Sequence, residues 1–232
     1  MNRSDFRFLD NQRVRWAEVD MQKIVFNGHY LMYVDTAVAG WWRAMAMPYE
    51  STMHALGGDL FVRKATLEYL GSARYDDRLD TGIRCVRIGN SSVLLQAAVF
   101  RDQTLLVRGE LVYVFADPAT QTSKPVPVLL RTLFEGFEAG EPMLSLRTGS
   151  WGDLRDAVSA LRLATSNPDH DGTDETAVHA VAVNRLGHGV GCARWARGAD
   201  AADAVRVIGA LRGAGIGSAL RQALATGRSP GP

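Results

Sequence analysis

Apolar and polar residues alternate along several stretches of the first 120 residues, which is the pattern of half-buried β-strands. The alternation predicts a first strand over Gln12–Val19, with Val14 and Trp16 on one face. Four longer stretches rich in β-branched and aromatic residues predict further strands, and the two-residue turns between the last three indicate antiparallel hairpins. These four strands are expected at Leu60–Leu70, Arg78–Ile88, Ser91–Arg101 and Thr104–Ala116.

The spacing changes between residues 29 and 47, where apolar residues recur every three or four positions and predict a long helix over His29–Met47. Its apolar stripe is formed by Leu31, Val34, Val38, Trp41 and Met45. One helix can cover five long strands only if the sheet curls around it. The pattern therefore predicts an α+β fold in which a curved antiparallel sheet wraps one long helix, with a short turn or helix over Tyr49–Leu56.

Composition changes near residue 140, because all three lysines precede that point and the remainder is richer in Ala and Gly. The turn-like string from Glu138 to Pro142 is the best candidate for a linker. We therefore expect a first domain at residues 1–138, a linker at 139–142 and a second domain at 143–232. The second domain is expected to contain strands at Met143–Arg147, Val178–Val183, Gly189–Ala196 and Val205–Ile208, and helices at Trp151–Ala164, with Ser150 as N-cap, and Ser218–Ala225.

The overall charge and the cysteines exclude several classes of protein. A formal net charge of +1 gives no reason to expect a nucleic-acid or membrane partner. Cys85 and Cys192 form no metal or redox motif, so we expect small buried thiols in a reducing cytoplasm. The N-terminus lacks the apolar core of a signal peptide, and no His/Asp/Glu cluster has the spacing of metal ligands.

The stretch Trp16–Tyr30 contains the groups that hydrolysis of an acyl bond requires. Asp20 ends the predicted strand, and a helix opens shortly afterwards at Asn27-Gly28. The first amides of a helix have no partner inside it, so this order sets a carboxylate beside free N–H donors. Two interpretations of Asp20 are open: a general base or nucleophile at a thioester or ester carbonyl, or a loop residue that caps the nearby helix or forms a turn.

Segment Val14–Asp35 resembles the hotdog-fold acyl-CoA thioesterases of the 4-hydroxybenzoyl-CoA thioesterase type. The resemblance rests on Asp20, the apolar step Ile24–Phe26, Tyr30 and Asp35, and extends over residues 5–138. It implies that Asp20 attacks the thioester carbonyl or activates water, while the backbone N–H of Asn27 polarises the carbonyl oxygen. The sequence departs from the family at Lys23, where a small residue, often Gly, is usual.

A single wrapped sheet offers little room for the pantetheine arm of CoA, and the second face of the sheet would need another subunit. We therefore expect the substrate pocket to lie between two subunits of a homodimer or homotetramer. Gly28, His29, Tyr30 and Ser91 would contact the acyl-CoA, whose CoA moiety is part of the substrate, and no cofactor would be required. For His29 we favour a structural hydrogen bond to a neighbouring loop. A serine-rich hairpin start explains Ser91 equally well.

A second candidate site lies at residues 212–217, where Arg-Gly-Ala-Gly-Ile-Gly precedes the last predicted helix. Glycines allow close backbone approach, and helix-start amides bind anions, so this is a pattern for phosphate binding. It resembles the acetyl-CoA pyrophosphate loop of GNAT N-acetyltransferases, which implies binding of acetyl-CoA at Arg212, Gly213, Gly215 and Gly217. Because the GNAT pattern stops after this helix, we expect a partial α/β domain of that type.

These observations together predict a cytoplasmic acyl-CoA thioesterase that hydrolyses an acyl-CoA to a free carboxylic acid and CoA. Two alternatives are retained. One is a bifunctional protein, or an N-acetyltransferase, that uses acetyl-CoA through the C-terminal segment. The other is an acyl-CoA binding module without catalysis.

Overall fold

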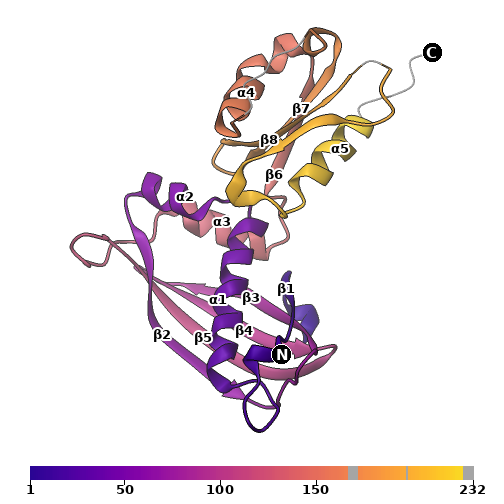
Figure 1. The fold of residues 1–232 in the computed structure, drawn as a ribbon. Coiled ribbons are helices and arrows are strands. Elements are labelled where there is room, and N and C mark those ends of the chain that lie inside the picture. The colour runs from indigo at the N-terminus through magenta and orange to yellow at the C-terminus, as the bar shows by residue number, and fades with distance from the viewer. Residues whose placement is uncertain (167–171, 197, 227–232) are drawn as a thin grey trace. The chain divides into compact units, whose positions relative to one another are not determined.

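The structure is a computed structural model that describes residues 1–166, 172–196 and 198–226. It divides into two compact units (Figure 1). The first consists of Met1–Ala44 and Tyr49–Glu141, and the second of Met45–Pro48 and Pro142–Pro232. Each unit contains its own sheet, so the two are considered separately below.

The first unit is a five-stranded antiparallel sheet with one long helix. The strands run in the order β1-β3-β4-β5-β2, which places β2 at one edge. Their bounds are β1 Phe8–Arg13, β2 Asp59–Tyr69, β3 Arg78–Ile88, β4 Ser92–Arg101 and β5 Thr104–Ala116. The helices are α1 Asn27–Ala44, α2 Tyr49–Leu56 and α3 Val128–Glu138, and short 3-10 helices cover Arg3–Asp5 and Trp16–Glu18.

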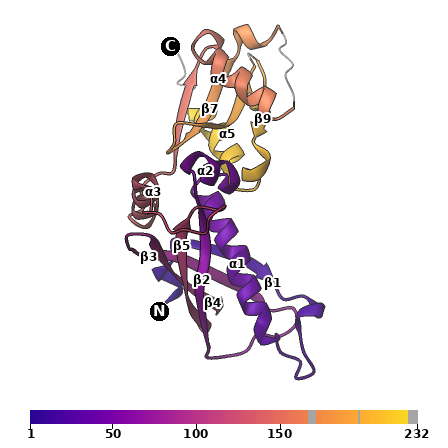
Figure 2. The same cartoon turned by 90° about the vertical axis from the view of Figure 1, so that its left-hand side faces the viewer.

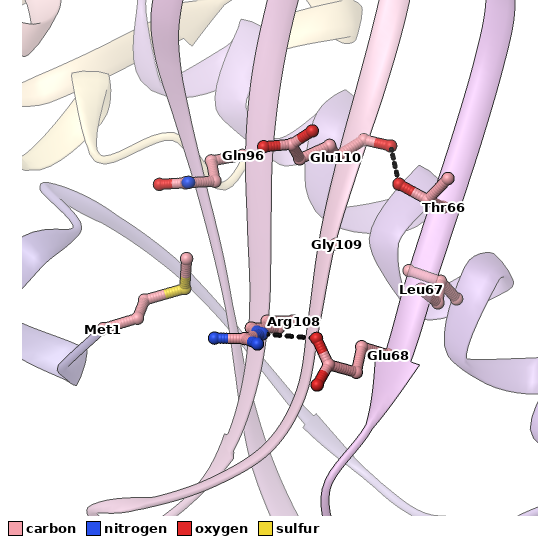
Figure 3. A pocket seen from close by; sticks show the side chains of 8 residues that line it. All are labelled: Met1, Thr66, Leu67, Glu68, Gln96, Arg108, Gly109 and Glu110. Atoms are coloured by element: carbon pink, nitrogen blue, oxygen red, sulfur yellow. Dashed lines mark hydrogen bonds and ion pairs between the residues drawn. The ribbon is translucent and has the colours of Figure 1, made fainter.

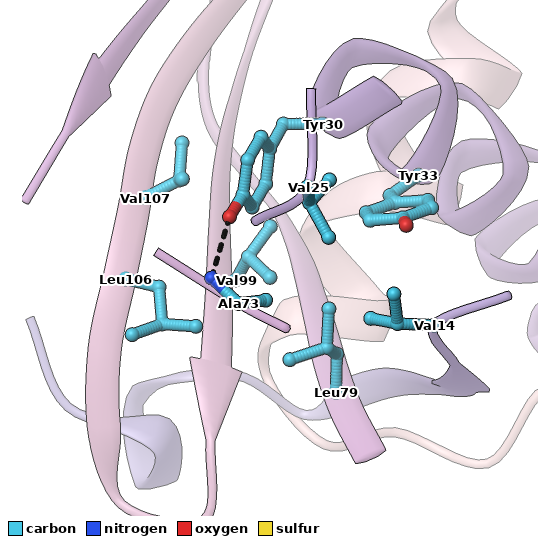
Figure 4. Packing of buried hydrophobic residues seen from close by; sticks show 9 residues of the cluster. All are labelled: Val14, Val25, Tyr30, Tyr33, Ala73, Leu79, Val99, Leu106 and Val107. Carbon is cyan, nitrogen blue, oxygen red and sulfur yellow. Dashed lines mark hydrogen bonds between the residues drawn. The ribbon is translucent and has the colours of Figure 1, made fainter. Parts of the chain in front are cut away.

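Helix α1 lies along one face of this sheet (Figures 1 and 2). Tyr30 and Tyr33 from its first turns pack with Leu79, Val99 and other apolar side chains of the strands (Figure 4). Further along the helix, α1 approaches β1 closely at Gly40, where an added Cβ would lie 2.7 Å from the ring of Phe8. Glycine is thus needed at that position for α1 to pack against β1.

The buried face of α1 differs from the predicted stripe. Leu31 is 37% exposed, whereas Tyr30 and Tyr33 are buried. Tyrosine can occupy the core here because each hydroxyl has a hydrogen-bond partner, as described below. The helix also ends at Ala44 rather than Met47, and Ala46 has a left-handed φ of 56° that stops it.

The first predicted strand was wrong in its bounds. The chain pairs with β3 only from Phe8 to Arg13, and a 3-10 helix follows at Trp16–Glu18. Val14 is buried as expected, but Trp16 is 74% exposed. Alternation failed here because the Glu18 carboxylate accepts the backbone N–H of Arg15 and folds the chain into a turn.

Helix α3 was not predicted from the sequence. It packs beside the end of α1, where Phe134 lies 4.9 Å from Trp41 between ring centroids and 5.5 Å from Trp42. The two tryptophans are therefore core residues, as expected, rather than a ligand site. Glu138 at the end of α3 accepts the backbone N–H of Cys85, on the part of β3 that extends beyond β1.

The second unit is an antiparallel sheet with one helix on each face. The strands run in the order β6-β7-β8-β9, with bounds Leu144–Gly149, Val178–Asn184, Gly189–Trp195 and Asp203–Val207. Helix α4 (Trp151–Ala164) packs on Val181 and Cys192, while α5 (Ile216–Thr226) packs on the alternate residues Ala180 and Ala182. Ser150 caps α4 through its hydroxyl, as the sequence predicts, and 3-10 turns cover Asp174–Thr176 and Gly209–Leu211.

A buried ion cluster lies beside α4. Asp174 is fully buried, and its carboxylate accepts hydrogen bonds from Arg162 at 2.6 and 2.7 Å and from Arg194 at 3.1 Å. Arg162 lies over the ring of Trp151, and the buried His179 contacts the Asp174 carbonyl oxygen at 2.9 Å. Both carboxylate oxygens of Asp174 are thus occupied by guanidinium groups.

Candidate active site

Asp20 lies on a short loop whose two ends are held together. Val19 and Val25 form an isolated antiparallel bridge, the Asp20 N–H donates to the Ile24 carbonyl at 2.9 Å, and the Phe26 N–H donates to the Glu18 carbonyl at 2.9 Å. The loop therefore leaves and returns at one point, immediately before α1. This brings the Asp20 segment next to the start of the helix.

The Asp20 side chain is half-buried and partly engaged. One carboxylate oxygen accepts the backbone N–H of Gln22 at 2.8 Å, which forms the turn that the sequence left open as an interpretation. No contact to the other oxygen is seen within the described part of the chain. Lys23 closes the turn with a left-handed φ of 61°, a conformation that glycine adopts without steric cost.

The start of α1 contains Asn27, the predicted oxyanion donor, and Gly28 and His29, two of the predicted substrate contacts. Asn27 opens the helix and is exposed, so its N–H is among the helix-start amides that lack an intrahelical acceptor. The ring of Phe26 lies over Gly28, where a Cβ would be only 2.9 Å from the ring. His29 packs its ring edge-to-face against Phe26 at 5.9 Å.

Tyr30, the third predicted substrate contact, lies inside the core. It is 2% exposed, its hydroxyl accepts the Ala73 N–H at 2.8 Å, and burial raises its pKa. Tyr69 at the end of β2 donates its hydroxyl to the Asn27 carbonyl at 3.1 Å. Tyr30 therefore supports the helix start from beneath, and the structure gives it no surface toward a ligand in this chain.

Ser91 is not brought together with Asp20 within one chain. The Asp20 loop adjoins the start of β3 and the end of β4, since Val14 N–H donates to the Asp77 carbonyl and Asp77 pairs with Arg101. Ser91 precedes the first residue of β4. The ten-residue length of β4 separates the two positions by about 30 Å.

Glu18 holds the loop and α1 together, and the sequence analysis did not identify it. The residue is 4% exposed, and its carboxylate accepts the Arg15 backbone N–H at 2.7 Å, the Arg15 guanidinium at 2.7 Å and the Tyr33 hydroxyl at 2.8 Å. Burial acts to raise the pKa of Glu18, but these hydrogen bonds and the Arg15 charge outweigh it and lower the pKa. Alternation places Glu18 on the same face as Val14 and Trp16, but it gives no sign that an acidic side chain there is held by buried hydrogen bonds.

A separate hollow of about 400 Å³ lies on the face of the sheet opposite α1 (Figure 3). Thr66, Gln96, Glu110 and the ion pair between Glu68 and Arg108 line it, together with Met1, Leu67 and Gly109. The charged lining and the position away from Asp20 make it unsuitable for an apolar acyl chain.

In the second unit, three of the four predicted phosphate-binding residues, Arg212, Gly213 and Gly215, lie in the loop before α5, and Gly217 lies in the first turn of α5. Gly213 and Gly215 have left-handed φ angles of 84° and 79°, and Arg212 is exposed. Ile216 is buried and anchors the first turn of α5. The arrangement leaves the helix-start amides of α5 facing a glycine-bearing loop, which is a geometry that can bind an anion.

Within residues 1–166, 172–196 and 198–226, no group of three or more His, Cys, Asp or Glu side chains is arranged to hold a metal ion. In the same ranges no helix is long and apolar enough to cross a membrane. Cys85 and Cys192 are free thiols, and burial raises their pKa values to about 12 and about 11.

Comparison with known sequences places the first unit in a family. Residues 14–134, just over half of the chain, match the thioesterase-like superfamily. The chain belongs to this superfamily. The matched range includes the Asp20 loop, α1 and all of β2–β5, and it ends before Pro142–Pro232 of the second unit.

The chain is also similar to two named bacterial proteins over about half of its length. The acyl-CoA thioester hydrolase YbgC of Escherichia coli O6:H1 is 31% identical over 132 residues, which cover 55% of this chain and 93% of YbgC. A putative esterase of Aquifex aeolicus is 24% identical over 122 residues, covering 53% of this chain and 94% of that protein.

Solved structures of related fold agree with the first unit. A thioesterase superfamily protein from Jannaschia has a TM-score of 0.52 at 22% identity and covers 55% of this chain and 90% of its own. SAV2348 from Staphylococcus aureus, solved in complex with CoA, has a TM-score of 0.53 at 15% identity. The match covers 60% of this chain and 87% of SAV2348. These likenesses confirm the hotdog architecture that the sequence resemblance implied for the first unit.

Proposed function

We propose that this protein is an acyl-CoA thioesterase, which hydrolyses an acyl-CoA to a free carboxylic acid and CoA. The proposal rests on the loop of residues 19–25. Because hydrogen bonds hold the two ends of this loop together, the half-buried carboxylate of Asp20 lies in a segment next to the amides at the start of α1. Membership of the thioesterase-like superfamily and the likeness to YbgC support the same reaction.

Asp20 acts on the carbonyl carbon in one of two ways. As a general base it accepts a proton from water while the water oxygen bonds to that carbon, the C–S bond breaks, and CoA leaves as a thiolate that takes up a proton. As a nucleophile its carboxylate oxygen bonds to the carbon, CoA leaves, and water hydrolyses the resulting anhydride. In both routes the Asn27 N–H stabilises the charge on the carbonyl oxygen, a contribution of about 10²–10³ in rate for such a donor.

The substrate pocket is proposed to form between two copies of the chain, in a homodimer or homotetramer. Edge strand β2 supports this, because its free side can pair with another strand and Val62 is 52% exposed on it. Tyr69, Leu70 and Leu31 add exposed apolar surface beside it. A second copy would cover this surface and supply the remaining contacts, including any made by Ser91, to the acyl-CoA.

No cofactor is required for the proposed reaction, and the CoA moiety enters as part of the substrate. The two free thiols support a reducing compartment, for which we propose the cytoplasm.

The direct test is release of CoA from a panel of aliphatic and aromatic acyl-CoAs by the full chain, followed with a thiol reagent. We expect turnover of at least one thioester well above the rate without protein. Binding of acyl-CoAs with no release of CoA would instead favour the alternative of a binding module without catalysis.

A second activity is proposed for the loop before α5, where Arg212, Gly213, Gly215 and Gly217 would bind the pyrophosphate of acetyl-CoA in a partial GNAT-like domain. The left-handed φ angles of Gly213 and Gly215, directly before the α5 start, favour it. If an amine also binds, the unit would be an N-acetyltransferase and the protein bifunctional.

This second activity is tested in an Asp20→Asn background, which removes the proposed hydrolysis. Gly215→Ala should weaken acetyl-CoA binding about tenfold by calorimetry, because a Cβ at a left-handed φ distorts the loop. Gly187→Ala is the matched control, since Gly187 has the same φ of 79° in the turn between β7 and β8. Equal affinities in the two variants would exclude this loop as the acetyl-CoA site, and CoA release that depends on an added amine would establish transfer.

A further inference from the structure

Glu18 connects the Asp20 loop to α1 through both its main chain and its side chain. Its carbonyl accepts the N–H of Phe26, the residue directly before α1, at 2.9 Å. Its carboxylate accepts the hydroxyl of Tyr33, which lies within α1 and is buried, at 2.8 Å. One residue, two positions before Asp20, thus sets where the loop sits relative to the helix start.

Arg15 also holds the buried Glu18 carboxylate. Its backbone N–H donates to Oε2, the oxygen that the Tyr33 hydroxyl also contacts, and its guanidinium donates to the other oxygen, Oε1, each at 2.7 Å. A buried carboxylate that loses a donor must find another or move, because an unsatisfied buried charge is costly. Removing the Tyr33 hydroxyl breaks the side-chain link from the loop to α1 and leaves Oε2 with one donor fewer, without removing any group proposed to meet the substrate.

We infer that Glu18 and Tyr33 are positioning residues for the proposed thioester hydrolysis, which fix the distance between the Asp20 carboxylate and the amides at the start of α1. The inference rests on the proposed function for its catalytic readout. Misplacement of reacting groups by about 1 Å can cost about 10²-fold in rate. Loss of the Glu18–Tyr33 hydrogen bond should therefore lower kcat while substrate contacts, and hence KM, stay the same.

The test compares Tyr33→Phe with Tyr49→Phe in the full chain. Tyr49 also donates its hydroxyl to a carboxylate, that of Asp59, but lies on α2 beyond the far end of α1. We expect Tyr33→Phe to lower kcat about 10- to 100-fold with KM within about threefold of wild type, and Tyr49→Phe to leave both unchanged. In the double variant Glu18→Gln/Tyr33→Phe, kcat should fall no further than in Glu18→Gln alone, because the two residues act as one unit.

A second measurement does not depend on activity. Hydrogen exchange at the amides of residues 19–26 should be faster in Tyr33→Phe than in wild type, and unchanged in Tyr49→Phe. If wild type hydrolyses acyl-CoAs but Tyr33→Phe retains full kcat, the positioning role is overturned while the proposed function stands. If wild type hydrolyses none, the proposed function fails, and unaltered exchange at residues 19–26 in Tyr33→Phe would overturn the positioning role as well.

Discussion

Two aspartates in this molecule illustrate how environment assigns a role to the same side chain. Asp174 in the second unit is fully buried, and two arginines occupy both of its oxygens. Asp20 in the first unit is half-buried on a loop, and one oxygen is held by the Gln22 amide. A carboxylate enclosed by guanidinium groups stabilises a fold, whereas one that is fixed at one oxygen keeps the other for chemistry.

The largest expected effect is on stability, at Asp174. Asp174→Asn leaves Arg162 buried without its full counter-charge, which should lower the free energy of unfolding by about 3–5 kcal/mol. Urea titration of the full chain measures this. Asp203→Asn is the matched control, because Asp203 is an exposed partner of Arg194 and its loss should cost far less. Equal losses in the two variants would contradict the structural role assigned to Asp174.

The next largest effect is on catalysis, at Asp20. Asp20→Asn should lower kcat for acyl-CoA hydrolysis about 10²-fold or more, because the amide can neither accept a proton nor attack the carbonyl. Its stability should change little, since an Asn oxygen can still accept the Gln22 amide. Asp156→Asn on the exposed side of α4 should leave kcat unchanged. Full activity in Asp20→Asn would remove this carboxylate from the mechanism.

A smaller effect is expected in the pH dependence of stability, through Glu18. Its pKa in the folded protein lies below the ordinary value of 4.5, so its contribution to stability is present above that value. The contribution is lost as the pH falls from about 4.5 through the lowered pKa. Unfolding free energies measured by urea titration between about pH 3 and pH 7 should therefore fall less steeply with acid in Glu18→Gln than in wild type. If the pH dependence of the unfolding free energy were the same in both proteins, the folded structure would not stabilise the ionised form of Glu18.

The smallest effect is expected where a carboxylate is exposed. Glu68 pairs with Arg108 at 2.6 Å on the outer face of the sheet, and both side chains are more than half exposed. Water screens such a pair, so Glu68→Gln should give no resolvable change in the thermal midpoint. A clear drop in the thermal midpoint of Glu68→Gln, measured by calorimetry, would show that an exposed carboxylate can stabilise the fold as the buried Asp174 does.

The regular elements could largely be predicted from the sequence. The hairpins of β3, β4 and β5 follow from long apolar strands and two-residue turns, and the Ser150 cap of α4 follows from its position before an amphipathic run. The start of α1 beside Asp20 could also be predicted, because the motif resembles the superfamily to which the chain belongs.

The missed features depend on tertiary contacts. Trp16 alternates like a strand residue, but the side chain of Glu18 turns the local backbone, and alternation carries no information about that hydrogen bond. The hydrogen bond that Tyr33, fifteen positions later, donates to Glu18 could not be predicted from the sequence. The burial of Tyr30 likewise depends on the distant Ala73 amide.

The left-handed backbone of Lys23 has a consequence for how this protein can be altered. A residue with a Cβ pays about 1 kcal/mol for that conformation, and glycine pays almost nothing. Lys23→Gly should therefore raise thermal resistance at the cost of a cation three positions from Asp20. At residue 23, a gain in thermal resistance would thus come with the loss of a positive charge from the loop that holds Asp20.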